Sequence, residues 1–140
     1  MKWMVCGLIV FFLQGFFLKA EGISIVSQGF DAYHITGSKS ALDVWLKDSP
    51  LMVDRDAYHK LENDLARIQM AYGNYRGQQI VKTVTIAEGL TRVYAVLFLE
   101  NGPIYISFDV YKKISSEIIS DVAFSVKADT FFPPDLIYGK

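Results

Sequence analysis

The spacing of apolar residues changes at Gly77, and this change constrains the fold more than any other feature of the sequence. Before Gly77, apolar side chains recur at helical spacing, and after it they alternate with polar side chains at every second residue. The alternation predicts four β-strands, at residues 78–86, 91–100, 103–111 and 117–126. The segments between these strands are short enough to join antiparallel neighbours, and the Asn-Gly pair after residue 100 favours a hairpin because both residues tolerate positive φ. The sequence therefore predicts a four-stranded antiparallel meander.

The first half of the chain predicts three helices. In residues 22–37 the apolar positions fall on one helical face, although Gly29 weakens the helix interior. Residues 38–47 predict a second, short helix, which we expect Ser38 to cap and Pro50 to terminate.

The third predicted helix is the best defined. Asp54 is its expected N-cap, Gly73 follows its end, and its apolar residues form a stripe at helical spacing. The stripe consists of Leu61, Leu65, Ile68 and Tyr72. Together with the meander, these helices predict an α+β fold in which three N-terminal helices pack on a curved four-stranded antiparallel sheet.

The second predicted strand is apolar on both faces, which indicates a central strand in a sheet covered on both sides. Its side chains are Val93, Ala95, Leu97 and Leu99 on one face and Tyr94, Val96 and Phe98 on the other. The helices can cover one face, and the other face then needs a C-terminal tail, a curled edge or a second subunit. Residues 131–140 form an apolar tail around Pro133 and Pro134, and we expect this tail to pack against the domain.

Residues 1–20 have the layout of a secretory signal peptide: an early lysine, an apolar run of about 16 residues, and Ala20 at the end. Cleavage after Ala20 leaves a domain at residues 21–130 and the tail at 131–140. The alternative is a retained membrane anchor, because Leu18 is larger than the side chain that a signal peptidase prefers. A membrane-spanning helix, however, needs about 20 apolar residues. We therefore expect a periplasmic or secreted protein without a stable membrane span once the signal peptide is removed.

Composition argues against several classes of function. Removal of Lys2 and Lys19 leaves 12 of the 14 basic residues against 15 acidic ones, a net charge of −3 without a basic cluster for nucleic acid. Cys6 is the only cysteine and lies in the predicted signal peptide. Export without cysteines fits a bacterial periplasm. His34 and His59 are not at metal-ligand spacing, and no motif indicates a metal site or a cofactor.

The order of helix, short helix, long helix and meander resembles the cystatin-like α+β architecture of the NTF2-like superfamily, in particular its small exported bacterial members. The resemblance spans residues 23–126 and is carried by Trp45 before the turn at 49–51, the stripe that ends at Gly73, the hairpin at 100–104, Phe108, and the Tyr-Lys pair at 111–112. It implies a sheet that wraps around the helices to form a conical cavity, and dimerisation through the outer sheet face in many members. Some members are isomerases, dehydratases or hydrolases and others only bind, so the resemblance selects no reaction.

Asp31 and His34 are candidate catalytic residues, although no recognisable catalytic motif includes them. They are three residues apart on one helical face, where a carboxylate can orient an imidazole and make His34 a general base. The alternative is a partly exposed helix end at which His34 lies favourably against the helix dipole. His59 has no second ligand nearby, which is typical of a solvated surface histidine.

The resemblance also implies a ligand cavity between helices and sheet. Its candidate lining residues are Phe30, Tyr33, Trp45, Leu65, Ile68 and Tyr72. The alternative for the same residues is an ordinary hydrophobic core.

The third predicted strand carries a polar row on the back of an apolar one. If its even-numbered residues face the helices, then Tyr105, Asp109 and Tyr111 point away from them. Aromatic residues are enriched in protein interfaces, and Tyr94 and Phe98 extend this face. These five interface candidates predict either a homodimer through the outer sheet face or contact with an unknown periplasmic protein, unless the C-terminal tail covers them.

These observations predict an exported, non-catalytic binding or association domain that uses no cofactor and binds no nucleic acid. The alternative is a small cavity enzyme of the isomerase, dehydratase or hydrolase type that acts on a small apolar molecule. A cavity of ligand size with two converging ionisable groups would favour the enzyme, and a filled core would favour the binding domain.

Overall fold

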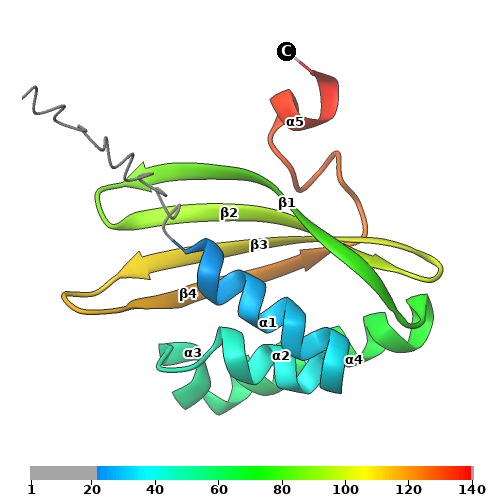
Figure 1. The fold of residues 1–140 in the computed structure, drawn as a ribbon, viewed down its shortest axis with the longest axis horizontal. Helices are drawn as coiled ribbons and strands as arrows, with labels where there is room; N and C mark the ends of the chain where they lie inside the picture. Colours follow the sequence, from blue (N-terminus) through cyan, green and yellow to red (C-terminus); the bar gives the residue numbers. More distant parts are fainter. Residues whose placement is uncertain (1–21, 140) are drawn as a thin grey trace, which may run out of the picture.

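The computed structural model describes residues 22–139 and confirms an α+β fold with a four-stranded antiparallel sheet (Figure 1). The predictions for residues 1–20, a signal peptide or a membrane anchor, lie outside the described residues. Within residues 22–139, no helix has the length and hydrophobicity that crossing a bilayer requires.

The sheet is the predicted meander, with strands in the order β1-β2-β3-β4. The strands are β1 (Tyr75–Ala87), β2 (Leu90–Leu99), β3 (Gly102–Lys112) and β4 (Glu117–Ser125). Most strand ends lie within one residue of the prediction, but β1 begins three residues early. The reason is that Tyr75 pairs with Leu99, and a bulge between Tyr75 and Gly77 keeps the strand in the sheet.

Four helices precede the sheet, rather than the three that the sequence predicts. They are α1 (Ile23–Thr36), α2 (Ser38–Trp45), α3 (Pro50–Val53) and α4 (Arg55–Tyr72), and a fifth, α5 (Pro134–Tyr138), lies in the tail. The additional helix α3 forms because Pro50 suits a first helical position and the Ser49 side chain accepts a hydrogen bond from the Leu51 amide, at 3.2 Å.

The two predicted helix caps have different outcomes. Asp54 is the N-cap of α4, and its side chain accepts a hydrogen bond from the Ala57 amide at 3.1 Å. Ser38 is not a cap, because Gly37 occupies that position and Ser38 is already the first helical residue. The Ser38 amide donates instead to Oε1 of Gln69, at 3.4 Å.

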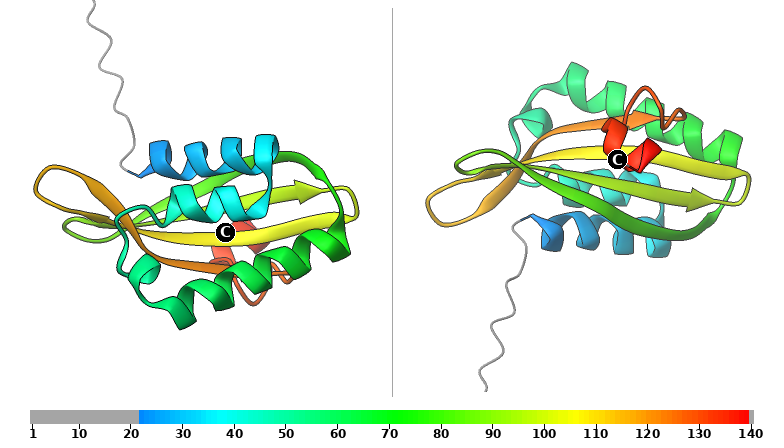
Figure 2. Two further views of the ribbon diagram at one scale, coloured as in Figure 1. Left: turned by 90° about the horizontal axis from the view of Figure 1, so that it is seen from below. Right: turned by 90° about the horizontal axis from the view of Figure 1, so that it is seen from above.

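The helices α1 to α4 lie on one face of the sheet, and α5 lies on the other (Figures 1 and 2). The core between the helices and the sheet is built on three fully buried rings, Phe30, Trp45 and Phe108, whose centroids are 5.0 to 5.9 Å apart. Gly29 allows this packing, because a Cβ atom there would lie 1.9 Å from Nε1 of Trp45. The glycine that the sequence suggests as a helix weakness is therefore a point of close helix contact.

The tail packs against the domain, as the sequence predicts, and it does so on the outer face of the sheet. Phe132 is only 8% exposed and lies edge-on against Tyr94 and Tyr105, with ring centroids 5.5 and 5.1 Å away. A salt bridge between Lys82 of β1 and Asp135 of α5 holds the tail at a second point. The sequence allows either the tail or a second subunit to cover this face, and the structure shows that the tail covers its centre.

Candidate functional site

The apolar stripe of α4 is incompletely covered by the rest of the domain. Leu65 is fully buried, but Leu61, Ile68 and Tyr72 are only partly buried at the margin of the core. Helix α4 packs mainly on α2 and α3, and it lies beside β4 at one margin of the sheet (Figure 2). One side of the apolar stripe is therefore left facing an open space next to β4.

This space is a groove of about 680 Å³ between α4 and the end of β4. We call it the α4–β4 groove. It is lined by Lys60, Leu61, Asp64, Arg67, Ile68, Ala71 and Tyr72 of α4 and by residues 122–126. Most of these side chains are apolar, and the volume lies within the range of about 300–1,000 Å³ that is typical of ligand sites.

The charged residues of the groove form a rim on α4. Asp64 accepts hydrogen bonds from Nζ of Lys60 at 2.9 Å and from Nη2 of Arg67 at 2.6 Å. These two bonds, that of Lys60 first, lower the pKa of the Asp64 carboxyl. Two cations and one carboxylate leave the rim with one net positive charge.

The strand that borders the groove is an edge of the sheet. Within residues 22–139, β4 pairs only with β3, so the backbone groups on its other side have no strand neighbour. In the first part of β4, a bulge lies between Ile119, which pairs with Val110, and the charged Asp121. A bulge and a charged side chain both protect a sheet edge from pairing with another strand. Residues 122–126, which are the end of β4 and the residue after it, carry no charge and include Phe124 and Val126.

The predicted cavity residues divide between the core and the groove. Phe30, Trp45 and Leu65 are fully buried and Tyr33 is nearly so, which corresponds to the ordinary-core alternative. Ile68 and Tyr72 line the α4–β4 groove instead. The sequence contains the stripe to which they belong, but it does not indicate which side of the stripe the sheet leaves uncovered.

Tyr33 is buried with a hydroxyl that has no hydrogen-bond partner among the described residues. Burial raises the pKa of this phenol to about 12. An unpaired buried hydroxyl is a cost to stability, since it loses its bonds to water without replacement.

His34 is exposed at the end of α1, beside a smaller pocket of about 330 Å³. Its ring stacks on Tyr75, with centroids 4.6 Å apart and an angle of 20° between the planes. Burial, and secondarily the charge of Asp31, raises the pKa of Tyr75. No hydrogen bond or ion pair joins Asp31 to His34 in the described part of the chain, so His34 is oriented by a ring and not by a carboxylate.

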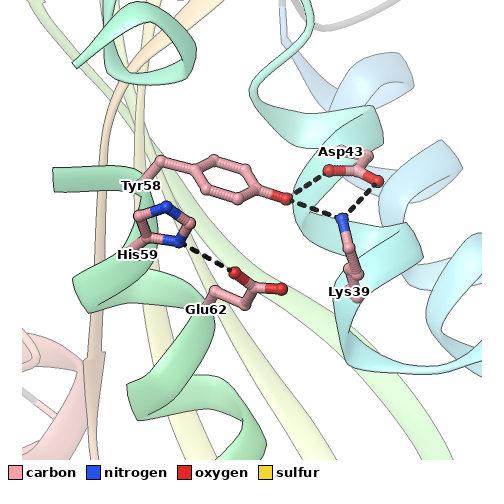
Figure 3. Close-up of polar contacts among 5 residues, drawn as sticks. All are labelled: Lys39, Asp43, Tyr58, His59 and Glu62. Carbon is pink, nitrogen blue, oxygen red and sulfur yellow. Dashed lines mark hydrogen bonds and ion pairs between the residues drawn. The ribbon is translucent and has the colours of Figure 1, made fainter. Parts of the chain in front are cut away.

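His59 is exposed on α4, next to a polar cluster that the sequence analysis does not anticipate (Figure 3). Tyr58 donates to Oδ1 of Asp43 at 2.5 Å, and Nζ of Lys39 donates to the Tyr58 hydroxyl at 3.2 Å and to Asp43 at 3.3 Å. Burial first, and then the bond to Asp43, raises the pKa of Tyr58. Nδ1 of His59 lies 3.3 Å from Oε2 of Glu62, and the His59 ring lies edge-on to that of Tyr58, with centroids 5.8 Å apart.

The Tyr58 cluster links α2 to α4 across the surface. Lys39 and Asp43 are at i, i+4 spacing and are visible as a pair in the sequence, but Tyr58 joins them only through the fold. Among residues 22–139, no group of three or more His, Cys, Asp or Glu side chains is arranged to hold a metal ion.

Three of the five outer-face interface candidates are engaged within the molecule. Tyr94 and Tyr105 lie under Phe132, and Asp109 forms a bidentate ion pair with Arg92, at 2.6 and 2.8 Å. The bond to Asp109 is the main reason that the pKa of the Arg92 guanidinium is raised.

The other two candidates remain exposed, Phe98 at 41% and Tyr111 at 49%. Phe98 pairs with Pro103 near the β2–β3 turn, whereas Tyr111 pairs with Leu90 at the opposite end of these strands. The two side chains therefore do not form one continuous apolar patch.

No family model, curated protein or solved structure matches the chain.

Proposed function

We propose that the protein is an exported, non-catalytic binding domain and that the α4–β4 groove is its binding site. The observation that carries this proposal is the groove itself: apolar side chains of α4 and an uncharged strand edge face a space of ligand size. The ionisable groups beside it support binding without a reaction, because Asp64 is held by two cations on the rim and, among the described residues, no other carboxylate and no histidine lines the groove.

Export and the resemblance to the NTF2-like superfamily belong to the same proposal. The apolar segment at 1–20 and the confinement of the only cysteine to that segment support a periplasmic or secreted location. Helices followed by a four-stranded meander support the resemblance at the level of element order.

A homodimer through the outer sheet face is a second candidate, favoured by the exposure of Phe98 and Tyr111. We rank the α4–β4 groove above the outer sheet face as the binding site, because Phe132 of the tail already occupies the centre of that face.

Binding of 8-anilinonaphthalene-1-sulfonate tests the proposed site. This dye combines apolar rings with an anionic group and so matches the apolar lining and the positive rim. We expect the Ile68→Glu variant to bind the dye at least tenfold more weakly than the natural protein, because it places a charge on the apolar lining.

The matched control is Met70→Glu, which introduces the same charge on the same helix at a residue that is 87% exposed and outside the groove. We expect this variant to bind the dye like the natural protein. Val126→Glu, at a half-exposed groove position, replaces Ile68→Glu if that variant does not fold. Equal fluorescence titrations for all variants would show that the dye binds elsewhere and would remove the groove as the site.

A further inference from the structure

The free edge of β4 and the uncovered stripe of α4 lie side by side, and one kind of ligand satisfies both. An extended peptide can pair its backbone with the edge of β4, while its side chains enter the groove. A compact small molecule can fill the groove but cannot satisfy a row of backbone N–H and C=O groups.

We propose that the α4–β4 groove binds an extended segment of another protein, which adds to the sheet as a fifth strand beside β4. This inference rests on the proposed function and names its ligand class. The segment carries apolar side chains at alternate positions and an acidic residue beside the rim.

The alternation follows from the register of β4. Val122 and Phe124 pair with Phe108 and Ile106, which face the helices and are fully buried. An added strand continues the pleat, so every second side chain points to the same side as Val122 and Phe124, toward the apolar stripe of α4. Those side chains would complete the burial of Ile68 and its partly buried neighbours.

The size of the free edge sets the length of the segment. The groove contacts residues 122–126, and at about 3.3 Å per residue five residues span roughly 16 Å. A bound segment of five or six residues has about three side chains facing the groove.

The two edges of the sheet differ in protection, and this difference selects β4. The other edge, β1, has three irregularities in its pairing and carries Arg76 and Lys82. Bulges and charges of this kind discourage strand addition. Residues 122–126 have neither feature.

Charge favours an acidic segment over a second copy of this chain. Lys60 and Arg67 outnumber Asp64 on the rim, so a carboxylate of the ligand can pair with one cation while Asp64 keeps the other. A two-fold pairing of two β4 edges would instead bring two rims of equal positive charge toward each other.

Selection from a displayed library of random linear twelve-residue peptides, with the purified protein as target, tests this inference. We expect the enriched peptides to share apolar residues at alternate positions and at least one acidic residue. A fluorescein-labelled synthetic copy of the most enriched peptide then serves as the probe for anisotropy titrations.

Three measurements on this probe separate strand addition from other modes of binding. Arg67→Glu should weaken binding at least tenfold, and Met70→Glu should leave it unchanged. Methylation of alternate backbone amides of the probe, in the register that faces β4, should abolish binding, whereas methylation in the other register should not. Amide hydrogen exchange should slow in residues 122–126 when the probe binds, and not in β1.

Each contrary outcome overturns the peptide proposal in a distinct way. An empty selection, or a probe that binds without protecting residues 122–126, excludes strand addition. A protein that sediments as a dimer with these amides already protected has a second copy as its occupant. If the dye titration still identifies the groove, the binding function stands without the peptide, and if the dye also fails, both proposals fall.

Discussion

Replacing Gly29 with alanine tests the tightest contact in the core. In an ordinary helix interior this change stabilises a protein by about 1 kcal/mol, because alanine has the higher helix propensity. Here the new Cβ atom would lie 1.9 Å from Nε1 of Trp45 and 2.4 Å from its Cε2. Since both atoms belong to a rigid, fully buried ring, α1 and α2 must separate to accommodate it.

The expected loss of stability follows from these opposing terms. Overpacking a core costs about 1–3 kcal/mol, and so close an approach places Gly29→Ala at the upper end. After the gain in helix propensity is subtracted, the free energy of unfolding falls by about 2 kcal/mol, or about 8 °C in Tm for a domain of this size. Urea denaturation followed by far-ultraviolet circular dichroism measures this change.

A double-mutant cycle with Trp45→Leu identifies the cause. In the Trp45→Leu background the clashing ring atoms are absent, so we expect Gly29→Ala to be neutral or stabilising by up to about 1 kcal/mol. Gln28→Ala, at an exposed neighbour, should stay within about 0.5 kcal/mol of the natural protein. If Gly29→Ala is as stable as the natural protein, the packing of α1 on Trp45 described above is refuted.

Two further predictions concern Tyr33 and the tail. Tyr33→Phe should raise the free energy of unfolding by about 1 kcal/mol, because it removes a buried hydroxyl without a partner among the described residues. Its folded-state pKa of about 12 exceeds the unfolded value of about 10, so the natural protein should lose stability as the pH rises from 10 to 12, and Tyr33→Phe should lose less. Equal alkaline denaturation of both proteins would contradict this assignment. For the tail, the hydrogen bond from Lys82 lowers the pKa of Asp135. The stabilisation of the docked tail by this ion pair is therefore complete above about pH 4 and is lost as the pH falls further. The protection factors of the amides in residues 131–138, which correct for the slower intrinsic exchange at low pH, should therefore fall on acidification and in Phe132→Ala at neutral pH. Unchanged protection factors in both cases would show that neither contact holds the tail.

The four strands, the helices α1, α2 and α4, and the order of these elements could be predicted from the sequence because the signals are local, whereas the short helices α3 and α5 were not predicted. Apolar alternation and the Asn-Gly turn specify the meander, and the Asp54 cap and the stripe before Gly73 specify α4. Local signals were also misleading where a tertiary contact decided the outcome. Gly37 is the N-cap of α2 in place of Ser38, whose amide donates to Gln69 of α4, and the pairing of Tyr75 with Leu99 begins β1 three residues before the predicted start.

The candidate site depended on tertiary structure. Ile68 and Tyr72 belong to the same stripe as Leu65, yet only the placement of α4 beside β4 leaves them at a groove while Leu65 is enclosed. Likewise, the sequence alone left the outer face open to a tail or a second subunit, and the position of Phe132 placed the tail there. The physical reason is the range of the interactions: periodicity acts between residues a few positions apart, whereas an uncovered surface depends on how elements distant in the sequence are spaced around the core.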